Sequence, residues 1–270
     1  MSTPQPSPAQ PGTLVLVTGA SAGIGRATAV RLAREGHLVA MVARDDAALE
    51  AARNELGHTA ANVRCFPADL AEAGQATALV ERIERSFDRP IDVLVDCAAR
   101  SVLGDVADVP LEKFRESFAV NFFSPLALTK ALLPRMLARR SGHLIFFTSG
   151  AGRRGLPGVA AYCATKFALT GFIESLRVEV LGRGIRVSAV SPGVVKTEIF
   201  RRAERYGAAR DRADPAGGIE PEQVAAAVAR LIRDPRRELN LSWRSQLGVR
   251  LNAVLPGLLD RMLAKKHHRP

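Results

Sequence analysis

Tyr162, Lys166 and Ser149 are the residues of this chain whose types and spacing could do acid–base chemistry. Lys166 follows Tyr162 by four positions, and residues at that spacing share one helix face, so we expect the Lys166 ammonium near the Tyr162 hydroxyl. A nearby cation favours the phenolate, so we expect the pKa of Tyr162 to fall from about 10 toward the working pH. Ser149 ends an apolar run, where its hydroxyl can donate a hydrogen bond to a substrate carbonyl oxygen. A Tyr and Lys at this spacing are more often an exposed helix pair, so the interpretation depends on other motifs.

A glycine-rich turn near the N-terminus supplies one of those motifs. Residues 18–25 read TGASAGIG, with glycines at positions 19, 23 and 25, and they lie between an apolar run and an amphipathic stretch. Backbone N–H groups at such a turn, together with the positive end of a helix dipole, can bind the pyrophosphate of a dinucleotide. A plain strand-to-helix turn is the alternative interpretation of these glycines taken alone.

Apolar runs and helical stretches alternate along the chain and would position both motifs. Strands that are apolar throughout and alternate with helices belong in a parallel sheet covered on both faces. We therefore predict a three-layer, doubly wound α/β/α (Rossmann) fold with a sheet of about seven strands, and one domain over residues 13–245. The expected strands are residues 14–17, 37–43, 63–66, 91–95, 143–148, 185–190 and 238–241, and the expected helices are 27–35, 46–56, 111–139 and 160–182.

Taken together, these features resemble the short-chain dehydrogenase/reductase family. The glycine spacing, followed by Ser149, Tyr162 and Lys166 in that order, matches the family's signature, and the resemblance extends over residues 13–242. It implies that Tyr162 donates and accepts the proton and that Lys166 binds the nicotinamide ribose. It also implies that Asn121 holds a water linking Lys166 to solvent, which gives a catalytic set of Asn121, Ser149, Tyr162 and Lys166.

The resemblance also implies where the cofactor binds. Residues 191–197, SPGVVKT, resemble the family's Pro-Gly segment, whose backbone and Thr contact the nicotinamide carboxamide. Asp69 resembles an adenine-contacting Asp, although a helix N-cap would explain it equally well. The expected cofactor-binding residues are Thr18, Gly19, Ser21, Ala22, Gly23, Ile24, Gly25, Ala43, Arg44, Asp69, Leu70, Cys97, Ala98, Ala99, Tyr162, Lys166, Pro192, Gly193, Val195 and Thr197.

The end of the second expected strand indicates which cofactor is preferred. Ala43 occupies the position where the family's NAD users carry a carboxylate for the adenosine 2′-hydroxyl, and Arg44 follows it. A guanidinium there suits a 2′-phosphate, which arginine can bind bidentately. Two features weigh against this: Ala22 lacks the basic residue that many NADP users carry in the glycine motif, and Asp45 could pair with Arg44. The balance predicts NADP(H).

The chain departs from the family pattern at residues 96–99, where Asp-Cys-Ala-Ala replaces the usual Asn-Asn-Ala-Gly. Asp96 can accept backbone hydrogen bonds but cannot donate as Asn would, and Ala99 lacks the backbone freedom of Gly. The departure puts the loop near the adenine ribose in question. It also motivates an alternative function, an NADP(H)-binding regulator or scaffold with little catalysis.

The composition and the cysteine spacing indicate which partners, metals and cellular locations to expect. The net charge is +11 and aromatic residues make up 5%, but the arginines are scattered, so we expect no nucleic-acid partner. The three cysteines have neither metal-ligand nor disulfide-framework spacing, so we expect no metal. Residues 1–12 are polar and Pro-rich, which predicts a disordered leader rather than a signal peptide. No apolar stretch of about 20 residues occurs, so we expect a cytoplasmic protein.

Two segments lie outside the recognised motifs. Residues 197–218 follow the Pro-Gly segment with little periodicity, and we expect a substrate lid there, with a solvated surface loop as the alternative. Residues 246–270 are amphipathic and end in basic residues, with His267 and His268 expected to be solvated. This segment could cap the substrate cleft or contact another subunit, form a peripheral membrane contact, or be a frayed tail.

The expected function is therefore reduction of a ketone or aldehyde by NADPH, or the reverse oxidation of an alcohol. The substrate is a small carbonyl or alcohol compound, and the apolar residues of the lid and C-terminal segment favour a hydrophobic one. A membrane-associated reductase of lipid or steroid-like carbonyls is a special case. We expect a homodimer or homotetramer, because family members pair through the helices that here cover residues 114–139 and 160–181.

Overall fold

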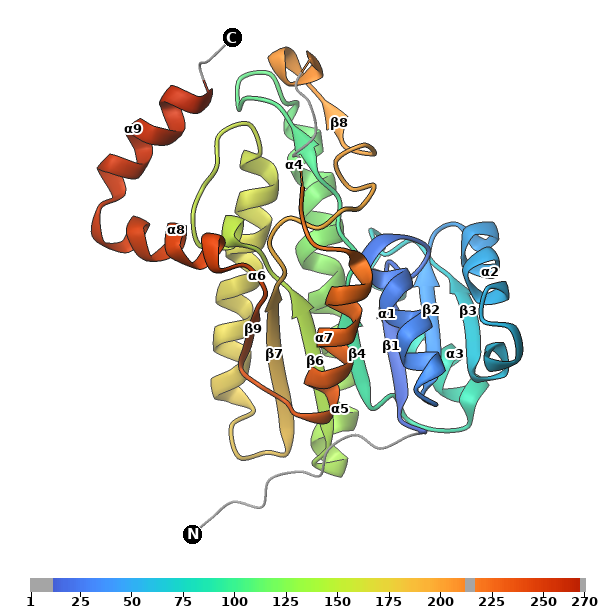
Figure 1. The fold of residues 1–270 in the computed structure, drawn as a ribbon. Helices are drawn as coiled ribbons and strands as arrows, with labels where there is room; N and C mark the ends of the chain where they lie inside the picture. Colours follow the sequence, from blue (N-terminus) through green and yellow to red (C-terminus); the bar gives the residue numbers. More distant parts are fainter. Residues whose placement is uncertain (1–11, 212–216, 268–270) are drawn as a thin grey trace.

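A seven-stranded parallel sheet forms the centre of the protein (Figure 1). The computed structural model describes residues 12–211 and 217–267. The strand order is β3-β2-β1-β4-β6-β7-β9, and every neighbouring pair is parallel. This confirms the predicted doubly wound sheet. The strands are β1 (Leu14–Thr18), β2 (Leu38–Ala43), β3 (Val63–Pro67), β4 (Val93–Asp96), β6 (Gly142–Phe147), β7 (Ile185–Ser191) and β9 (Glu238–Asn240).

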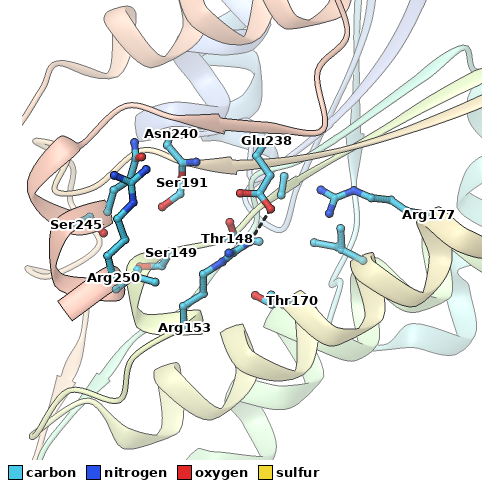
Figure 2. A pocket seen from close by; sticks show the side chains of 15 residues that line it. Thr148, Ser149, Arg153, Thr170, Arg177, Ser191, Glu238, Asn240, Ser245 and Arg250 are labelled. Atoms are coloured by element: carbon cyan, nitrogen blue, oxygen red, sulfur yellow. Dashed lines mark hydrogen bonds and ion pairs between the residues drawn. The ribbon is translucent and has the colours of Figure 1, made fainter. Parts of the chain in front are cut away.

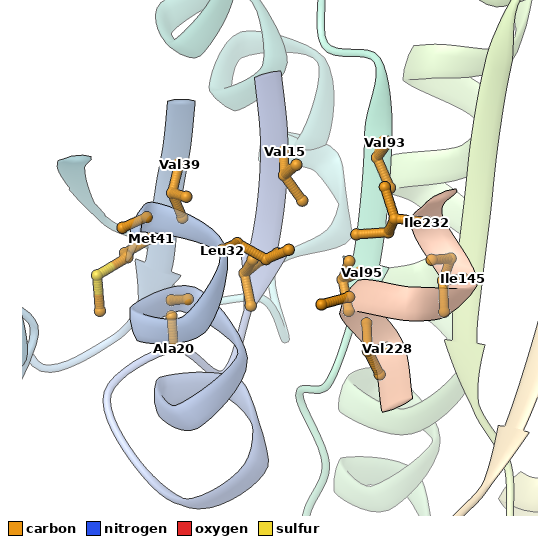
Figure 3. Packing of buried hydrophobic residues seen from close by; sticks show 14 of the residues in the cluster. Val15, Ala20, Leu32, Val39, Met41, Val93, Val95, Ile145, Val228 and Ile232 are labelled. Carbon is orange, nitrogen blue, oxygen red and sulfur yellow. The ribbon is translucent and has the colours of Figure 1, made fainter. Parts of the chain in front are cut away.

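Helices cover both faces of this sheet. On one face lie α1 (Gly23–Arg34), α2 (Asp46–Asn54) and α7 (Pro221–Arg233), and on the other α3 (Ala76–Phe87), α5 (Ser124–Arg139) and α6 (Ala160–Glu179). Alternate strand residues enter the two cores. Val15 packs in the core beside α1 and α7 (Figure 3), and Val17 belongs to the same core, whereas Leu14 and Leu16 pack on the opposite face. Because both faces are buried, each strand needs apolar residues throughout, which is why the apolar runs identified the strands.

The expected helix over residues 111–139 is divided by a local distortion. The structure has α4 (Leu111–Phe118), a π-helical turn over Ala119–Phe123, and then α5. A π-helical turn adds one residue to the helical repeat and occurs frequently at functional sites. Asn121 lies in this turn and is 1% exposed, so the extra residue directs its side chain into the interior.

Part of the expected lid has regular structure. A short strand, β8 (Glu204–Arg205), pairs in parallel with β5 (Val102–Leu103), which follows the sheet strand β4. Residues 207–211 form a 3-10 turn, and residues 212–216 of the expected lid lie outside the described part of the chain. Three further 3-10 turns cover Gly57–Asn62, Ala73–Gln75 and Gly150–Gly152. The lid segment is thus tied to the loop after β4.

The C-terminal segment forms two helices, α8 (Trp243–Val254) and α9 (Pro256–His267). Arg154 forms an ion pair with Asp260 of α9 and a hydrogen bond with Asn252 of α8. His267 is not solvated as expected: its side chain is 9% exposed, and Nε2 lies 2.8 Å from Asp105 Oδ1. Over residues 243–267 the frayed-tail interpretation is therefore wrong.

Two of the expectations fall outside the described residues. Apart from Gly12, the expected leader at residues 1–12 lies outside them, and so does His268. Among the residues described, none of the helices is long and apolar enough to cross a bilayer.

Candidate active site

The expected catalytic residues meet at the carboxyl-terminal edge of the sheet. Ser149 follows β6 in extended conformation, and its Oγ accepts a hydrogen bond of 3.2 Å from Ala151 N, which caps the 3-10 turn over Gly150–Gly152. The Ser149 side chain also shares a hydrogen bond with Tyr162, which lies in the first turn of α6. A substrate oxygen placed at this pair would meet two hydroxyl groups.

Lys166 is held beneath Tyr162 by the backbone of β6. The Lys166 side chain is 2% exposed, its Nζ donates a 2.8 Å hydrogen bond to the carbonyl oxygen of Phe147, and Nζ lies 5.6 Å from the centre of the Tyr162 ring. The predicted placement of both residues on one helix face is therefore observed. The ammonium, however, faces the Tyr162 ring and donates its hydrogen bond to the backbone.

The electrostatic expectation for Tyr162 is wrong in this structure. Burial raises the pKa of Tyr162 to about 12, a hydrogen bond with Ser149 lowers it, and Cys163 raises it further. We expected Lys166 to lower this pKa, but removal of the phenol from solvent outweighs any such effect. A phenol with this pKa is protonated at neutral pH, which is the form that can donate a proton.

Asp96 connects the phosphate-binding turn to Lys166 electrostatically. Its carboxylate is 2% exposed and accepts a 2.8 Å hydrogen bond from Thr18 Oγ1, which in turn accepts from the backbone N–H groups of Cys97 and Ala98, each at 3.0 Å. The backbone N–H groups that follow Asp96 thus donate to Thr18, although the Asp96 carboxylate could also accept such hydrogen bonds. Burial raises the pKa of Asp96 to about 6, with the Thr18 hydrogen bond and the charge of Lys166 acting in the opposite direction. Burial lowers the pKa of Lys166 to about 8, and Asp96 counteracts that shift.

The Asn121 side chain connects the π-helical turn to the loop after β4 and to α6 by hydrogen bonds. Its Oδ1 accepts a 2.8 Å hydrogen bond from Arg100 N, and its Nδ2 donates to Arg100 O at 3.0 Å and to Thr165 Oγ1 at 3.1 Å. Arg100 follows β4, and Thr165 precedes Lys166 on α6. These contacts use both N–H groups of the amide and one acceptor position of its oxygen, so Asn121 fixes the loop after β4 against the helix that carries Tyr162.

The glycine-rich turn has the geometry of an anion-binding site. Gly19 and Gly23 have φ values of +62° and +52°, which favour glycine, and a Cβ on Gly25 would overlap the carbonyl oxygen of Gly19. Ala22 precedes α1 without a capping side chain, and the first turn of α1 contains no acidic residue. The first N–H groups of this helix are therefore available to a phosphate.

The Pro-Gly segment after β7 lies beside this turn. A Cβ at Gly23 would approach Thr197 Cγ2 to 3.1 Å, and Val195 forms an isolated bridge with Ile219 that fixes the segment before α7. Gly193 lies against Ser242 at the start of α8. Ser21 and Ile24 belong to the glycine-rich turn and the start of α1. The remaining expected cofactor-binding residues lie at strand ends on the same edge: Ala43 ends β2 and Arg44 follows it, Asp69 and Leu70 come after β3, Cys97, Ala98 and Ala99 after β4, and Pro192 after β7.

Two local contacts bear on the cofactor-binding residues at the ends of β2 and β3. Arg44 is exposed, and Asp45 does not pair with it, because Asp45 Oδ1 caps α2 through a 3.0 Å hydrogen bond from Ala48 N. Asp69 Oδ1 accepts a 2.9 Å hydrogen bond from Ala71 N, which makes it the cap of a tight turn rather than of α3. Among the residues that the structure describes, none pairs with the Arg44 guanidinium, which can therefore bind an anion.

A family comparison agrees with this geometry. A sequence model described as short chain dehydrogenase matches residues 13–206, which include the glycine turn, Asp96, Ser149 and the Tyr–Lys pair. The chain belongs to this short-chain dehydrogenase family. The match ends before α7, so the C-terminal helices α8 and α9 lie beyond it.

Relatives of this short-chain dehydrogenase extend over most of its length. It is 33% identical to a Drosophila melanogaster dehydrogenase/reductase SDR family protein 7-like over 264 residues, which cover 95% of this chain and 81% of the relative. It is 32% identical to a 3-dehydrosphinganine reductase of Danio rerio, with 81% and 68% of the two chains covered. Its fold is similar to the crystal structure of an alcohol dehydrogenase from Thermococcus sibiricus complexed with 5-hydroxy-NADP, with 27% identity, a TM-score of 0.74, and 85% and 95% of the chains covered.

Several contacts in the site could not be found from the motifs. The carbonyl of Phe147, which holds Lys166, carries no signal because every residue has a carbonyl group. Thr165 and Arg100, which hold Asn121, are unremarkable as sequence. Asp96 did carry a signal, since it replaces an Asn of the family pattern, but its proximity to Lys166 depends on the adjacency of β4 and β6.

Proposed function

We propose that this short-chain dehydrogenase reduces a ketone or aldehyde with NADPH, or catalyses the reverse oxidation of an alcohol. The observation that carries the proposal is the shared hydrogen bond of Ser149 and Tyr162, with Lys166 fixed under the Tyr162 ring. This arrangement lies on the same sheet edge as the open N-terminus of α1. The geometry suits a carbonyl oxygen at the two hydroxyls and a dinucleotide extended along the strand ends.

The protein's own groups would handle the oxygen and the proton. The Ser149 hydroxyl donates a hydrogen bond to the substrate oxygen, which stabilises the negative charge that develops there. Tyr162 gives its phenolic proton to that oxygen; its pKa of about 12 keeps the proton in place until charge builds on the substrate. Lys166 then lies 5.6 Å from the ring that has become negative, so its ammonium favours the phenolate at that moment. Bound NADPH supplies the hydride.

Two features at the carboxyl-terminal edge of the sheet favour NADP(H). The α1 N-terminus and the glycine turn would hold the pyrophosphate, and the exposed Arg44 beside buried Ala43 would hold the 2′-phosphate. Asp45 is engaged in capping α2, so no carboxylate competes for Arg44. Lys166 and Asn121 would position the nicotinamide ribose and the proton path, and the solved alcohol dehydrogenase with 5-hydroxy-NADP supports the same cofactor class.

A panel of ketones and aldehydes, followed by NADPH absorbance, tests the proposal. We expect turnover on at least one hydrophobic carbonyl compound, with NADPH preferred to NADH. Tight NADPH binding without turnover in either direction would contradict it and support the regulator or scaffold alternative, which the altered residues 96–99 motivate.

A lipid-like carbonyl substrate is a second candidate, favoured by one observation. Five aliphatic side chains in α8, in α9 and between the two helices are 48–76% exposed, and basic residues follow them: Leu247, Val254, Leu255, Leu258 and Met262, then Lys265 and Lys266. Such a surface suits a peripheral membrane contact, where a lipid substrate would be found. One relative, from Danio rerio, is named for the reduction of a lipid, 3-dehydrosphinganine.

Vesicle binding separates this candidate from the first. We expect the protein to float with vesicles containing anionic lipid, and Leu258→Glu or truncation after Gly248 to reduce flotation. Leu181→Glu, at a site 81% exposed beyond α6, is the control and should leave flotation unchanged. A protein that never binds vesicles contradicts the membrane contact and leaves the reductase proposal intact.

We also propose a homodimer or homotetramer assembled through α4, α5 and α6. Phe123, at the junction of the π-helical turn with α5, is 49% exposed, and Phe167 on α6 is 45% exposed. Aromatic side chains of this size are enriched at protein interfaces. Sedimentation should give a dimer or tetramer for the wild type and a smaller species for Phe123→Glu; a monomeric wild type would contradict the assembly.

A further inference from the structure

A cavity of about 300 Å³ lies between α8 and the sheet, beside Ser149 but without Tyr162 in its wall (Figure 2). Its walls come from the end of β6, from α6, from β7 and β9, and from α8. Gly150 lies directly against Ser245 of α8, so the cavity adjoins the turn that Ser149 caps. A volume of this size admits a small molecule.

Three guanidinium groups face this cavity and only one carboxylate does. Arg153 comes from the loop after β6, Arg177 from α6 and Arg250 from α8, and Glu238 of β9 is the single acidic residue in the wall (Figure 2). Glu238 is already engaged, because its Oε1 lies 2.6 Å from Arg153 Nη2. The wall therefore carries an excess of positive charge.

Arg177 is half-buried and therefore partly removed from water, whereas Arg153 and Arg250 are exposed. Arg177 is anchored by hydrogen bonds to the carbonyl oxygens of Val187, at 3.0 Å, and Arg237, at 2.6 Å. Burial lowers the pKa of Arg177; the charge of Arg237 lowers it as well, Glu238 and Glu174 raise it, and Arg153 lowers it again. The opposing carboxylates do not offset the burial and the positive neighbours. A bound anion would.

The cavity also contains polar groups that have no partner. Within the described part of the chain, Arg250 forms no ion pair or hydrogen bond, although it projects from α8 toward the cavity (Figure 2). The same holds for the side chains of Ser191, Asn240 and Gln246, which line the wall. An oxyanion with several acceptor oxygens could accept from these donors together.

We propose that this cavity is a binding site for a small molecule carrying a carboxylate or phosphate group, held by Arg153, Arg177 and Arg250. A ligand bound there would connect α8 to α6 and β9, next to the 3-10 turn over Gly150–Gly152 that Ser149 caps. Ser149 is part of the wall, but Tyr162, Lys166 and the glycine-rich turn are not, so this is a second ligand site beside the proposed active site, and it does not rest on the proposed reaction.

Trp243 provides a direct readout of binding. It is the single tryptophan of the chain, it begins α8, and it is 68% exposed two residues before the cavity residue Ser245. Inorganic phosphate and succinate, titrated in parallel at ionic strength held constant with NaCl, should each be tested for a saturable change in Trp243 fluorescence. A response to phosphate alone identifies a phosphate group as the ligand's anion, and a response to succinate alone identifies a carboxylate.

Paired substitutions locate the response in the cavity. Arg250→Gln should weaken the binding of the responding anion about tenfold or more, and should leave the melting temperature near that of the wild type because Arg250 has no partner to lose. Glu238→Gln should tighten binding several-fold, because it removes the competing carboxylate from Arg153. Arg261→Gln, an exposed arginine of α9 outside the cavity, is the matched control and should bind as the wild type does.

A second control separates this site from the cofactor edge. Arg44→Gln should leave the Trp243 response unchanged, since Arg44 lies after β2. The proposal is overturned if neither anion changes Trp243 fluorescence beyond the effect of NaCl, if Arg250→Gln binds as tightly as the wild type, or if Glu238→Gln weakens binding. None of these readouts uses turnover, so failure of the proposed reductase activity would be recognised separately.

Discussion

Replacing Asp96 by Asn should stabilise the protein, and by an amount that grows with pH. Asp96 is 2% exposed and its pKa is raised from an ordinary value of 3.8 to about 6, chiefly by burial. Since the folded pKa lies above the unfolded one, the unfolded chain loses this proton more readily. The carboxyl therefore reduces stability as pH rises from about 4 to about 6, and the reduction persists above that range.

The size of the effect follows from the two pKa values. Their difference corresponds to about 3 kcal/mol at pH 8, and only about 1.5 kcal/mol of that is present at pH 5. Asn at this position has an amide oxygen that can accept the hydrogen bond from Thr18 Oγ1. Asp96→Asn should therefore raise the free energy of unfolding by up to these amounts at the two pH values.

Urea denaturation of wild type and Asp96→Asn at pH 5 and pH 8 measures this difference. Asp234→Asn is the control, because Asp234 pairs with Arg236 at a site where both side chains are 70% exposed. Its effect should stay below about 1 kcal/mol at either pH. A loss of stability in Asp96→Asn that is equal at both pH values would refute the reasoning. It would show that the Asp96 side chain stabilises the folded protein and that burial of its charge does not destabilise it.

Two further predictions concern the cofactor edge. Arg44→Gln should weaken NADPH binding about tenfold or more and leave NADH binding unchanged, because the guanidinium is exposed and free to bind a 2′-phosphate; equal losses for both cofactors, measured by fluorescence titration, would contradict this. Gly25→Ala should destabilise the protein by about 2 kcal/mol or more, because the new Cβ overlaps the Gly19 carbonyl, whereas Gly171→Ala in α6, with open space around it, should stabilise by about 0.8 kcal/mol. Thermal denaturation compares the two glycines, and an unchanged melting temperature for Gly25→Ala would contradict the predicted overlap.

The sheet was predictable because its strands are buried on both faces. Runs such as Leu14–Thr18 and Leu38–Ala43 contain apolar residues at successive positions, which distinguishes them from amphipathic helices. The order of the strands in the sheet was not predicted, because an apolar run does not show which other strands lie beside it. The division of the helix over residues 111–139 was not predictable, because a π-helical turn such as Ala119–Phe123 has no sequence signature of its own.

The site was predictable in its members and not in its electrostatics. The four-residue spacing correctly placed Tyr162 and Lys166 on one helix face, but the sign of the Tyr162 shift depends on burial, which spacing does not report. The same limit applies to His267, whose pairing with Asp105 brings together residues far apart in the sequence. The cavity with Arg153, Arg177 and Arg250 was also hidden, since its arginines are scattered along the chain.

Tyr162→Phe tests the central claim most directly, because it removes only the hydroxyl that shares a hydrogen bond with Ser149. The assay is steady-state reduction of the best carbonyl substrate, with NADPH affinity measured separately by fluorescence. The account predicts that kcat falls by about 10³-fold or more, in the range expected for a lost general acid in an intact site, while the Kd for NADPH changes less than about threefold. A Tyr162→Phe protein with near-normal kcat would contradict the assignment of Tyr162 as the proton donor.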